Sequence, residues 1–352
     1  MKKTIALALC AIILAGCCNS GKNAPSNQGA GSQEPQYEEL NQLAFASLSV
    51  INMREKPGYA AELGTQALMG TPVKVHYAPE DDYWVCIETP DGYKAWVNEM
   101  AISMTDEQAL ADWKGAKRMI VTSFYSFFLE EPKADAQHVS DAVWGCIVRY
   151  AGTSGAYTEV ILPTGKKAYI PTADVMDFEQ WATTRKAVVG PDASQAEIDA
   201  ARAEIIATAK AFIGVPYLWA GTSIKGVDCS GFAKSVYYLN GYLLLRNASQ
   251  QYKTGDNIDV SEGIDNLQPA DLVFFGREAT ADKPERITHV GIYLGDGMII
   301  HSSQVVRINN VVDKNAENYY SRKIIRATRI IGAQDCGKDV TSIAASDFYF
   351  NK

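Results

Sequence analysis

The chain is poor in residues that bind metals. It has four histidines among 352 residues, and none of its seven cysteines stands in Cys-x-x-Cys spacing. Because these spacings match no common zinc pattern, we expect no metal and no cofactor. A chain of this length also forms a core without disulfide staples. Cys86 and Cys146 lie in apolar, strand-like segments, so we expect them to be buried.

The chain also lacks an excess of basic charge. Its formal net charge is −8, and removing Lys2 and Lys3 would make it −10. This argues against nucleic acid or an anionic membrane surface as a partner. The apolar run at 5–14 is shorter than the roughly 20 residues of a membrane-spanning helix, so residues 1–16 are expected to be a signal peptide. Leu14-Ala15-Gly16-Cys17 resembles the bacterial lipobox, which implies lipidation of Cys17; an ordinary secretory signal is the alternative.

The first part of the mature chain changes character near residue 37. Residues 18–35 are rich in Asn, Gly, Ser and Gln, so 17–36 are expected to be a flexible, lipidated tether. Residues 37–105 contain short β-rich runs separated by turn residues, which predict a small antiparallel barrel. Two of its segments, 52–57 and 92–97, resemble the bacterial SH3-like domain of cell-wall proteins.

A second stretch repeats this organisation after a predicted helix at 106–117. The segments 129–132, 143–148 and 163–170 follow the order and spacing of 54–57, 68–73 and 90–97. We therefore interpret 106–185 as a linker helix and a second SH3-like barrel. A single larger β domain is the alternative.

The last third has the pattern of an α+β domain, expected at 190–335. Residues 191–194 offer N-caps for a helix at 195–213, and a second helix follows Cys229. Strand candidates come next, at 271–275, 288–294, 298–303 and 324–330. Residues 336–352 are expected to be a C-terminal tail.

Cys229 lies at the start of the second helix, where backbone N–H groups and the helix dipole favour a thiolate. The alternative is a small buried side chain. A cysteine nucleophile needs a base, and two of the four histidines lie in this domain. We expect His289 to be the base and His301 to orient its ring. A core role for His289, or a metal site with Asp228, are the alternatives.

The two histidines stand on strands joined by Gly295-Asp296-Gly297. Because side chains alternate along a strand, both point to one face only if the loop has an odd length or the hairpin has a bulge. Direct opposition of the two would centre the turn near Gly295. A plain two-residue turn at 296–297 would put them on opposite faces and contradict the catalytic assignment.

Several motifs of this domain occur in a fixed order. They are residues 216–221, 228–232, 268–275, 289–295 and 301–303, which read PYLWAG, DCSGF, QPADLVFF, HVGIYLG and HSS. The set resembles the NlpC-type cysteine peptidases, which implies a papain-like fold and cleavage of peptidoglycan stem peptides. By that resemblance Cys229 is the nucleophile, His289 the base and His301 the orienting residue. Tyr217 resembles the family tyrosine that, with the backbone N–H of Cys229, stabilises the oxyanion.

With its SH3-like barrels the chain resembles the γ-D-glutamyl-L-diamino acid endopeptidases called dipeptidyl-peptidase VI. This implies a first barrel that helps close the pocket and a substrate with a free N-terminal L-Ala. The matching substrate-binding positions are Asp228, Ser230, Glu55, Tyr93, Arg246 and Ser249. Helix capping, a solvated charge and barrel packing are the structural alternatives. Asn247 and Ala248 differ from the Asp or Ser that members of the group can carry.

The sequence therefore predicts an exported monomer, lipid-anchored in the cell envelope and facing the periplasm from the outer membrane. It would hydrolyse the bond between γ-D-Glu and the diamino acid of stem peptides, with no nucleic acid partner. One alternative is a non-catalytic peptidoglycan-binding lipoprotein. Another is a cysteine amidase or acyltransferase on the same fold.

Overall fold

The structure is a computed structural model that describes residues 40, 42–77, 83–190 and 192–351. The predicted signal peptide, the lipidation site Cys17 and the tether lie outside the described residues. The described residues all belong to one compact unit. No helix in the described part is long and apolar enough to cross a membrane.

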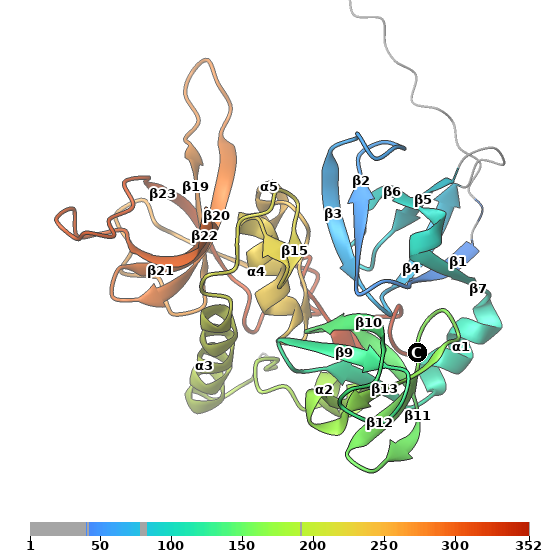
Figure 1. The fold of residues 1–352 in the computed structure, drawn as a ribbon. Coiled ribbons are helices and arrows are strands. Elements are labelled where there is room, and N and C mark those ends of the chain that lie inside the picture. The colour runs from blue at the N-terminus through green and yellow to red at the C-terminus, as the bar shows by residue number, and fades with distance from the viewer. Residues whose placement is uncertain (1–39, 41, 78–82, 191, 352) are drawn as a thin grey trace, which may run out of the picture. The chain divides into compact units, whose positions relative to one another are not determined.

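Seven strands form the first barrel, which Figure 1 draws in blue and cyan. They are β1 (Gln42–Ala46), β2 (Val50–Arg54), β3 (Leu63–Leu68), β4 (Pro72–Tyr77), β5 (Trp84–Glu88), β6 (Lys94–Asn98) and β7 (Ile102–Thr105), with the 3₁₀ turn η1 (Glu99–Ala101) before β7. The sheet order is β3-β2-β6-β5-β4-β1-β7, and the pairs are antiparallel. Side-chain alternation places Ile51, Met53 and Val97 in the core, where all three are fully buried.

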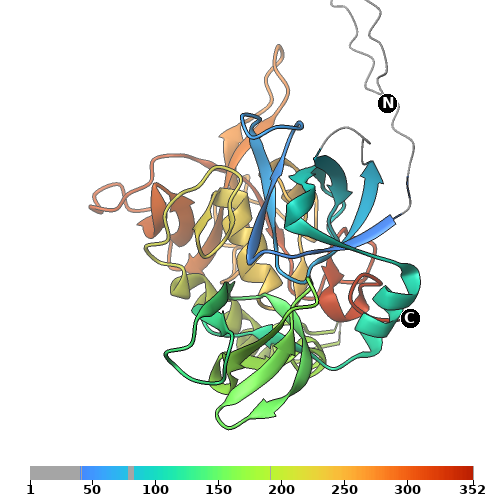
Figure 2. The ribbon, with the colours of Figure 1, turned by 45° about the vertical axis from the view of Figure 1, so that its right-hand side comes forward.

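The second barrel, green in Figure 2, repeats this topology. Its strands are β8 (Arg118–Val121), β9 (Tyr125–Leu129), β10 (His138–Val143), β11 (Ile147–Ser154), β12 (Tyr157–Ile161), β13 (Lys167–Pro171) and β14 (Val175–Asp177), with η2 (Thr172–Asp174) before β14; α1 (Glu107–Gly115) precedes the barrel and α2 (Phe178–Thr183) follows it. The order β10-β9-β13-β12-β11-β8-β14 is that of the first barrel with every strand number raised by seven. The turns after β3 and β10 also correspond, since Gly70 and Gly145 have φ values of 80° and 95°. The repeat in the sequence is therefore a repeat of strand topology.

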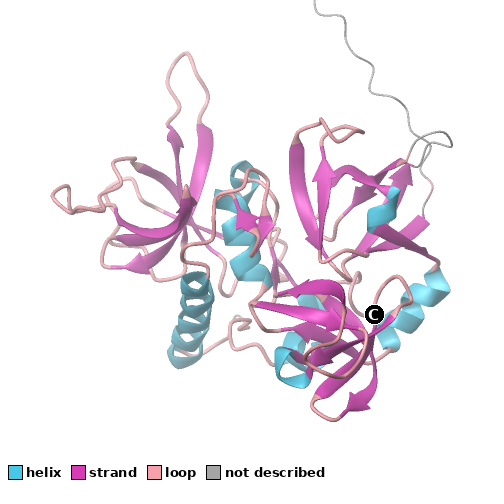
Figure 3. Ribbon diagram, in the orientation of Figure 1, coloured by secondary structure: helices cyan, strands magenta, loops and turns pink. Residues whose placement is uncertain are grey.

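The remaining elements form the α+β domain, whose helices and strands Figure 3 distinguishes. They are α3 (Gln195–Ala211), β15 (Thr222–Ser223), β16 (Gly226–Val227), α4 (Cys229–Tyr238), β17 (Tyr242–Leu243), α5 (Ala248–Gln251), β18 (Asp256–Ile258), β19 (Leu272–Arg277), β20 (Arg286–Gly295), β21 (Met298–Ser303), β22 (Val305–Asn310), β23 (Ile324–Arg329), β24 (Thr341–Ser342) and η3 (Ile343–Ala345). The main sheet has the order β18-β23-β19-β20-β21-β22. The α+β fold class is confirmed. In the main sheet, β19, β20, β21 and β23 correspond to the four predicted strands, and β18 and β22 were not predicted.

Helix α4 packs on this sheet through an apolar face. Phe232 and Val236 of the helix are fully buried in one cluster with Phe274, Val290 and Ile300 of the sheet. Full burial of each such side chain contributes about 1.5–3 kcal/mol. The packing fixes the first turn of α4, and therefore Cys229, against β20.

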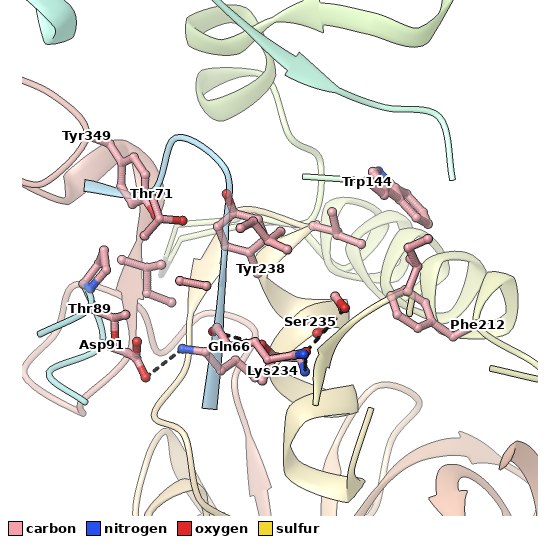
Figure 4. A pocket seen from close by; sticks show the side chains of 18 residues that line it. Gln66, Thr71, Thr89, Asp91, Trp144, Phe212, Lys234, Ser235, Tyr238 and Tyr349 are labelled. Carbon is pink, nitrogen blue, oxygen red and sulfur yellow. Dashed lines mark hydrogen bonds and ion pairs between the residues drawn. The ribbon is translucent and has the colours of Figure 1, made fainter. Parts of the chain in front are cut away.

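The later part of α4 and strand β15 contact the two barrels, and Tyr238 at the end of α4 donates to the carbonyl of Gly145 in the second barrel at 3.1 Å. Lys234 Nζ lies 2.7 Å from Asp91 Oδ2 of the first barrel. Thr222 Oγ1 donates to the carbonyl of Gln66 in β3 at 3.1 Å. The residues of the last two contacts and Trp144 of the second barrel line a cavity of about 60 Å³, shown in Figure 4. The first barrel is thus tied to the helix that carries the cysteine.

The C-terminal residues, predicted as a tail, are an integral part of the fold. Strand β24 pairs with β17. Tyr349 is buried, and its carbonyl accepts a hydrogen bond of 2.6 Å from Arg118 of β8. The guanidinium of Arg118 lies 4.6 Å from the ring centre of Trp113 and 4.8 Å from that of Phe178. The segment therefore covers the second barrel.

Candidate active site

Cys229 is the first residue of α4, and Asp228 is its N-cap. The cysteine is half-buried, and the backbone N–H groups of Ser230 and Val290 donate to its sulfur. Val290 directly follows His289 in β20. The predicted nucleophile and the predicted base are therefore brought to neighbouring positions by α4 and β20.

The thiol is the favoured form of Cys229. Burial raises its pKa to about 11, and the negative charge of Asp228 acts in the same direction. The two backbone N–H groups and Arg246 lower the pKa but are outweighed. The backbone N–H groups favour the thiolate, as expected, but the net shift is upward because burial raises the free energy of the charged form by more than these groups lower it.

A β-bulge puts His289 and His301 on one face. The loop is the plain two-residue turn Asp296-Gly297, with φ values of 50° and 70°, as a type I′ turn requires. The register shifts between Tyr293 and Gly295, which inserts one extra residue into β20. The turn alone would have separated the histidines, and the bulge restores their common face.

The two histidines are diagonal neighbours across β20 and β21. They are not directly opposite each other, because direct opposition would need a turn centred near Gly295. Beyond the bulge Ile292 pairs with Ile300, so His301 stands across from Gly291. A Cβ atom on Gly291 would lie 3.3 Å from the Cβ of His301. The missing side chain at 291 therefore leaves room for the ring of His301 to reach His289.

A chain of hydrogen bonds runs from His289 into the sheet. His289 Nε2 lies 2.7 Å from His301 Nδ1, and His301 Nε2 lies 2.9 Å from Asn309 Oδ1 on β22. Asn309 Nδ2 donates to the carbonyl of Asn318, so its Oδ1 accepts and His301 Nε2 carries a proton. We therefore assign the donor at His289 to Nε2. Its Nδ1 keeps the unshared pair that can take a proton from Cys229.

Burial holds the pKa of both histidines well below the usual range. For His289 the charges of His301 and Arg322 lower the pKa further. For His301 the hydrogen bond to Asn309 opposes the shift without cancelling it. Both rings are neutral at pH 7, which is the form in which His289 accepts a proton.

Changing Asn309 should move the pH dependence of catalysis. Because the pKa of His289 is lowered, the acid limb of kcat/KM is expected below pH 6.5, the usual value for histidine. In Asn309→Asp a carboxylate would favour protonated His301, which cannot accept from His289. We expect the acid limb to move up by about one pH unit. Measuring kcat/KM from pH 4 to 8 checks this, with the exposed Asn315→Asp as the control; an acid limb identical to the wild type would argue against the role of Asn309.

Asp228, Ser230 and Arg246 form a closed cluster beside Cys229. Arg246 Nη2 lies 2.6 Å from Asp228 Oδ2, and its Nη1 donates to Ser230 Oγ at 3.0 Å. The three side chains belong to residues that are 7%, 6% and 2% exposed. Asp228 also accepts the backbone N–H of Ala220 at 3.0 Å. The charge of Asp228 is therefore already balanced, and the cluster is suited to holding the first turn of α4.

Tyr217 lies near the nucleophile, in the loop before β15. The charges of Asp228 and Arg246, and that of Cys229 when it is ionised, act on its hydroxyl, so these groups are its neighbours. Burial raises the pKa of Tyr217 to about 12. The phenol therefore keeps its proton and can donate a hydrogen bond to a developing oxyanion.

The first barrel contributes a second polar pair. Tyr93 donates to Glu55 Oε1 at 2.6 Å, and the charge of Arg246 acts on Tyr93, so the pair lies near the Arg246 cluster. Burial, reinforced by Glu55, raises the pKa of Tyr93, which stays a donor. In the second barrel the equivalent positions are Glu130 and Lys166, an ion pair of 3.2 Å. Among the ion pairs of the described residues none involves Glu55, so its charge is available to a ligand.

Two residues beside the histidines were not predicted. Asn309 gave only a weak signal, as a polar residue at the end of an apolar run. Tyr320 gave no signal in the sequence, yet its ring centre lies 4.7 Å from that of His301 and 5.8 Å from that of His289.

Ser249, which was predicted to bind substrate, is exposed on α5. Its side chain makes no hydrogen bond to another described residue of the site.

The other cysteines of the described residues form no disulfide bond with Cys229. Cys86, Cys146 and Cys336 are free, as is Cys229. Cys146 is buried as expected, whereas Cys86 is only half-buried. In the described ranges no group of three or more His, Cys, Asp or Glu residues is arranged to hold a metal ion.

Two bacterial peptidases align with about three quarters of this chain. The γ-D-glutamyl-L-lysine dipeptidyl-peptidase of Bacillus cereus (strain ATCC 10987 / NRS 248) is 29% identical over 269 residues, which cover 74% of this chain and 73% of that protein. Dipeptidyl-peptidase 6 of Lysinibacillus sphaericus is 26% identical over 269 residues, covering 75% of this chain and 88% of that protein. The relation therefore includes barrel and peptidase regions together.

Solved structures and family patterns agree on the fold. A crystal structure of an NlpC/P60 family protein from Bacillus cereus ATCC 10987 has a TM-score of 0.62 at 24% identity, covering 82% of this chain and 99% of that one. An NlpC/P60 endopeptidase from Photobacterium damselae subsp. piscicida has a TM-score of 0.56 at 15% identity, covering 87% and 74%. Residues 214–329 match the NlpC/P60 family and residues 49–103 the bacterial SH3 domain. The chain thus carries an NlpC/P60 domain preceded by a bacterial SH3 domain.

Proposed function

We propose that this chain is a cysteine peptidase that cuts the bond between γ-D-Glu and the diamino acid of peptidoglycan stem peptides with a free N-terminal L-Ala. The observation that carries the proposal is the hydrogen-bonded chain His289, His301, Asn309 on strands that face the first turn of the Cys229 helix. The names of the relatives, both dipeptidyl-peptidases, favour this bond.

The reaction would follow from the groups in place. His289 Nδ1 takes the proton of the Cys229 thiol as the sulfur attacks the γ-carbonyl carbon. The oxyanion receives hydrogen bonds from Tyr217 and from the backbone N–H of Cys229. The C–N bond then breaks, and His289 returns the proton to the departing amine. Water, deprotonated by His289, hydrolyses the thioester and releases the thiol and the γ-glutamyl carboxylate.

Product analysis tests this function. We expect the purified chain to convert L-Ala-γ-D-Glu-L-Lys into L-Ala-D-Glu and free lysine, both visible by mass spectrometry. A set of defined muropeptides separates the alternatives. Binding without cleavage would indicate a silent wall-binding protein. Release of the whole stem peptide from the muramoyl group would indicate an amidase, and formation of a new amide would indicate an acyltransferase. A location in the cell envelope stays a prediction that rests on the motif Leu14 to Cys17.

A further inference from the structure

Two arginines beside the catalytic histidines have no acidic partner. Arg322 Nη2 donates to Thr288 Oγ1 at 2.5 Å, and its Nη1 donates to Tyr320 OH at 3.4 Å; both acceptors are neutral hydroxyls. Arg307 stands directly opposite His301 on β22. In the part of the chain that the structure describes, no ion pair involves either arginine. Their charges are therefore free to act on a ligand.

Arg322 is held at the reaction centre and is exposed there. Thr288 directly precedes His289, and the ring of Tyr320 contacts both histidine rings. The charge of Arg322 acts on His289 and on His301. Neighbouring arginines of β23 differ, since Arg326 is paired with Glu285 at 3.0 Å and Arg329 with Asp271 at 2.8 Å. An unpaired guanidinium is a good binding group for a carboxylate, which it contacts through two N–H groups.

The site therefore has charges of opposite sign at two places. Glu55 supplies an unpaired negative charge from the first barrel, and Arg322 supplies a positive charge beside His289. A short peptide with free ends has the complementary pattern, an ammonium at one end and a carboxylate at the other. His289 protonates the departing amine in the proposed function, so groups next to it face the leaving residue rather than the acyl part.

We propose that Arg322 binds the carboxylate of the leaving diamino acid, which makes the preferred substrate a released peptide that ends at that residue. The inference rests on the proposed function, because it uses the direction in which the substrate lies across Cys229 and His289. A longer stem peptide, in which this carboxylate is an amide, would lose the contact. The α-carboxylate of D-Glu is the other carboxylate of such a peptide, and the test separates the two.

The test compares three substrates and four proteins. The substrates are L-Ala-γ-D-Glu-L-Lys, the same peptide with a C-terminal amide, and the same peptide with the D-Glu α-carboxylate amidated. The proteins are the wild type, Arg322→Gln, Arg322→Lys and the control Arg326→Gln. We expect the wild type and the control to lose about tenfold in kcat/KM on C-terminal amidation, chiefly through KM. Arg322→Gln should cleave L-Ala-γ-D-Glu-L-Lys and its C-terminal amide with equal kcat/KM. Arg322→Lys should restore part of the difference in kcat/KM between these two substrates.

The possible results separate a failure of this inference from a failure of the proposed function on which it rests. Effects of Arg322 on the histidines change all three substrates alike, so the ratio between acid and amide reports binding alone. If Arg322→Gln keeps the full preference for the C-terminal acid, or instead loses only its response to the D-Glu carboxylate, the assignment is overturned while the peptidase function stands. If the wild type cuts none of the three, the proposed function itself fails.

Discussion

Replacing Cys229 with Ala should reduce kcat for L-Ala-γ-D-Glu-L-Lys by at least a factor on the order of 10⁴. The hydroxyl of Ser230, the next residue of α4, is buried and accepts a hydrogen bond from Arg246 at 3.0 Å, so we do not expect it to replace the sulfur. His289 alone can only activate water. Thermal stability should change little, because Cys229 is half-buried and the substitution removes one sulfur atom. Single-turnover product analysis and a thermal melt together measure both effects.

The matched control is Cys86→Ala, since Cys86 is also free and half-buried but lies in β5 of the first barrel. It should leave kcat/KM unchanged. Turnover by Cys229→Ala at the wild-type rate would remove the thiol from the mechanism. A lower melting temperature together with lost activity would mean that the substitution harms folding, and Cys229→Ser then separates the two effects.

The positions of helix and turn elements followed from local chemistry. Ser194 and Glu197 form a capping box, and the helix predicted at 195–213 is α3, Gln195–Ala211. The two barrels could be aligned by their turns because Gly70 and Gly145 occupy backbone conformations that other residues rarely adopt. Signals of this kind lie within a few residues of the element that they define.

From the sequence, we could state only under which hairpin geometry the side chains of His289 and His301 point to the same face. Alternation and turn length determine which side chains share a face, but a bulge reverses the result with a single extra residue. The bulge lies between Tyr293 and Gly295, and the sequence 293–295 does not reveal whether β20 takes it. The structure has the plain turn and the bulge together. The bulge condition is therefore met, whereas the statement that a plain two-residue turn would put the histidines on opposite faces is wrong for this hairpin.

The partners of Asp228 and His301 could not be predicted because they come from distant segments. Arg246 lies 18 residues beyond Asp228 and reaches it only through the fold of the loop before α5. Asn309 reaches His301 because β22 pairs with β21, a pairing that depends on the whole sheet. Sequence reasoning therefore selected Cys229, His289, His301 and Arg246, but it did not predict that Arg246 pairs with Asp228 or that Asn309 bonds to His301.

This difference changes which residue should recognise the substrate amine. Asp228 was a candidate, but Arg246 already balances its charge. Glu55 has only the hydroxyl of Tyr93 as a hydrogen-bond donor among the described residues. A substrate ammonium next to Glu55 would gain a charge-assisted hydrogen bond without breaking an ion pair. If the proposed function holds, we therefore expect Glu55 rather than Asp228 to bind the free N-terminus of the substrate.

Acetylating the N-terminus of L-Ala-γ-D-Glu-L-Lys should then lower kcat/KM by a factor on the order of 10² or more. The acetyl group removes the positive charge and leaves Glu55 facing a neutral amide. Glu55→Gln should weaken cleavage of the free peptide on the order of tenfold and reduce the discrimination between the free and acetylated peptides. Steady-state kinetics on both peptides measures this ratio for each variant.

The internal repeat supplies the matched control. Glu130 occupies in the second barrel the place that Glu55 has in the first, but it is paired with Lys166. Glu130→Gln should therefore leave the ratio between free and acetylated peptide at its wild-type value. Equal rates for both peptides in the wild type would mean an open cleft that accepts internal segments. A Glu130→Gln variant that lost the discrimination would mean that the second barrel, rather than the Glu55 and Tyr93 pair, recognises the amine.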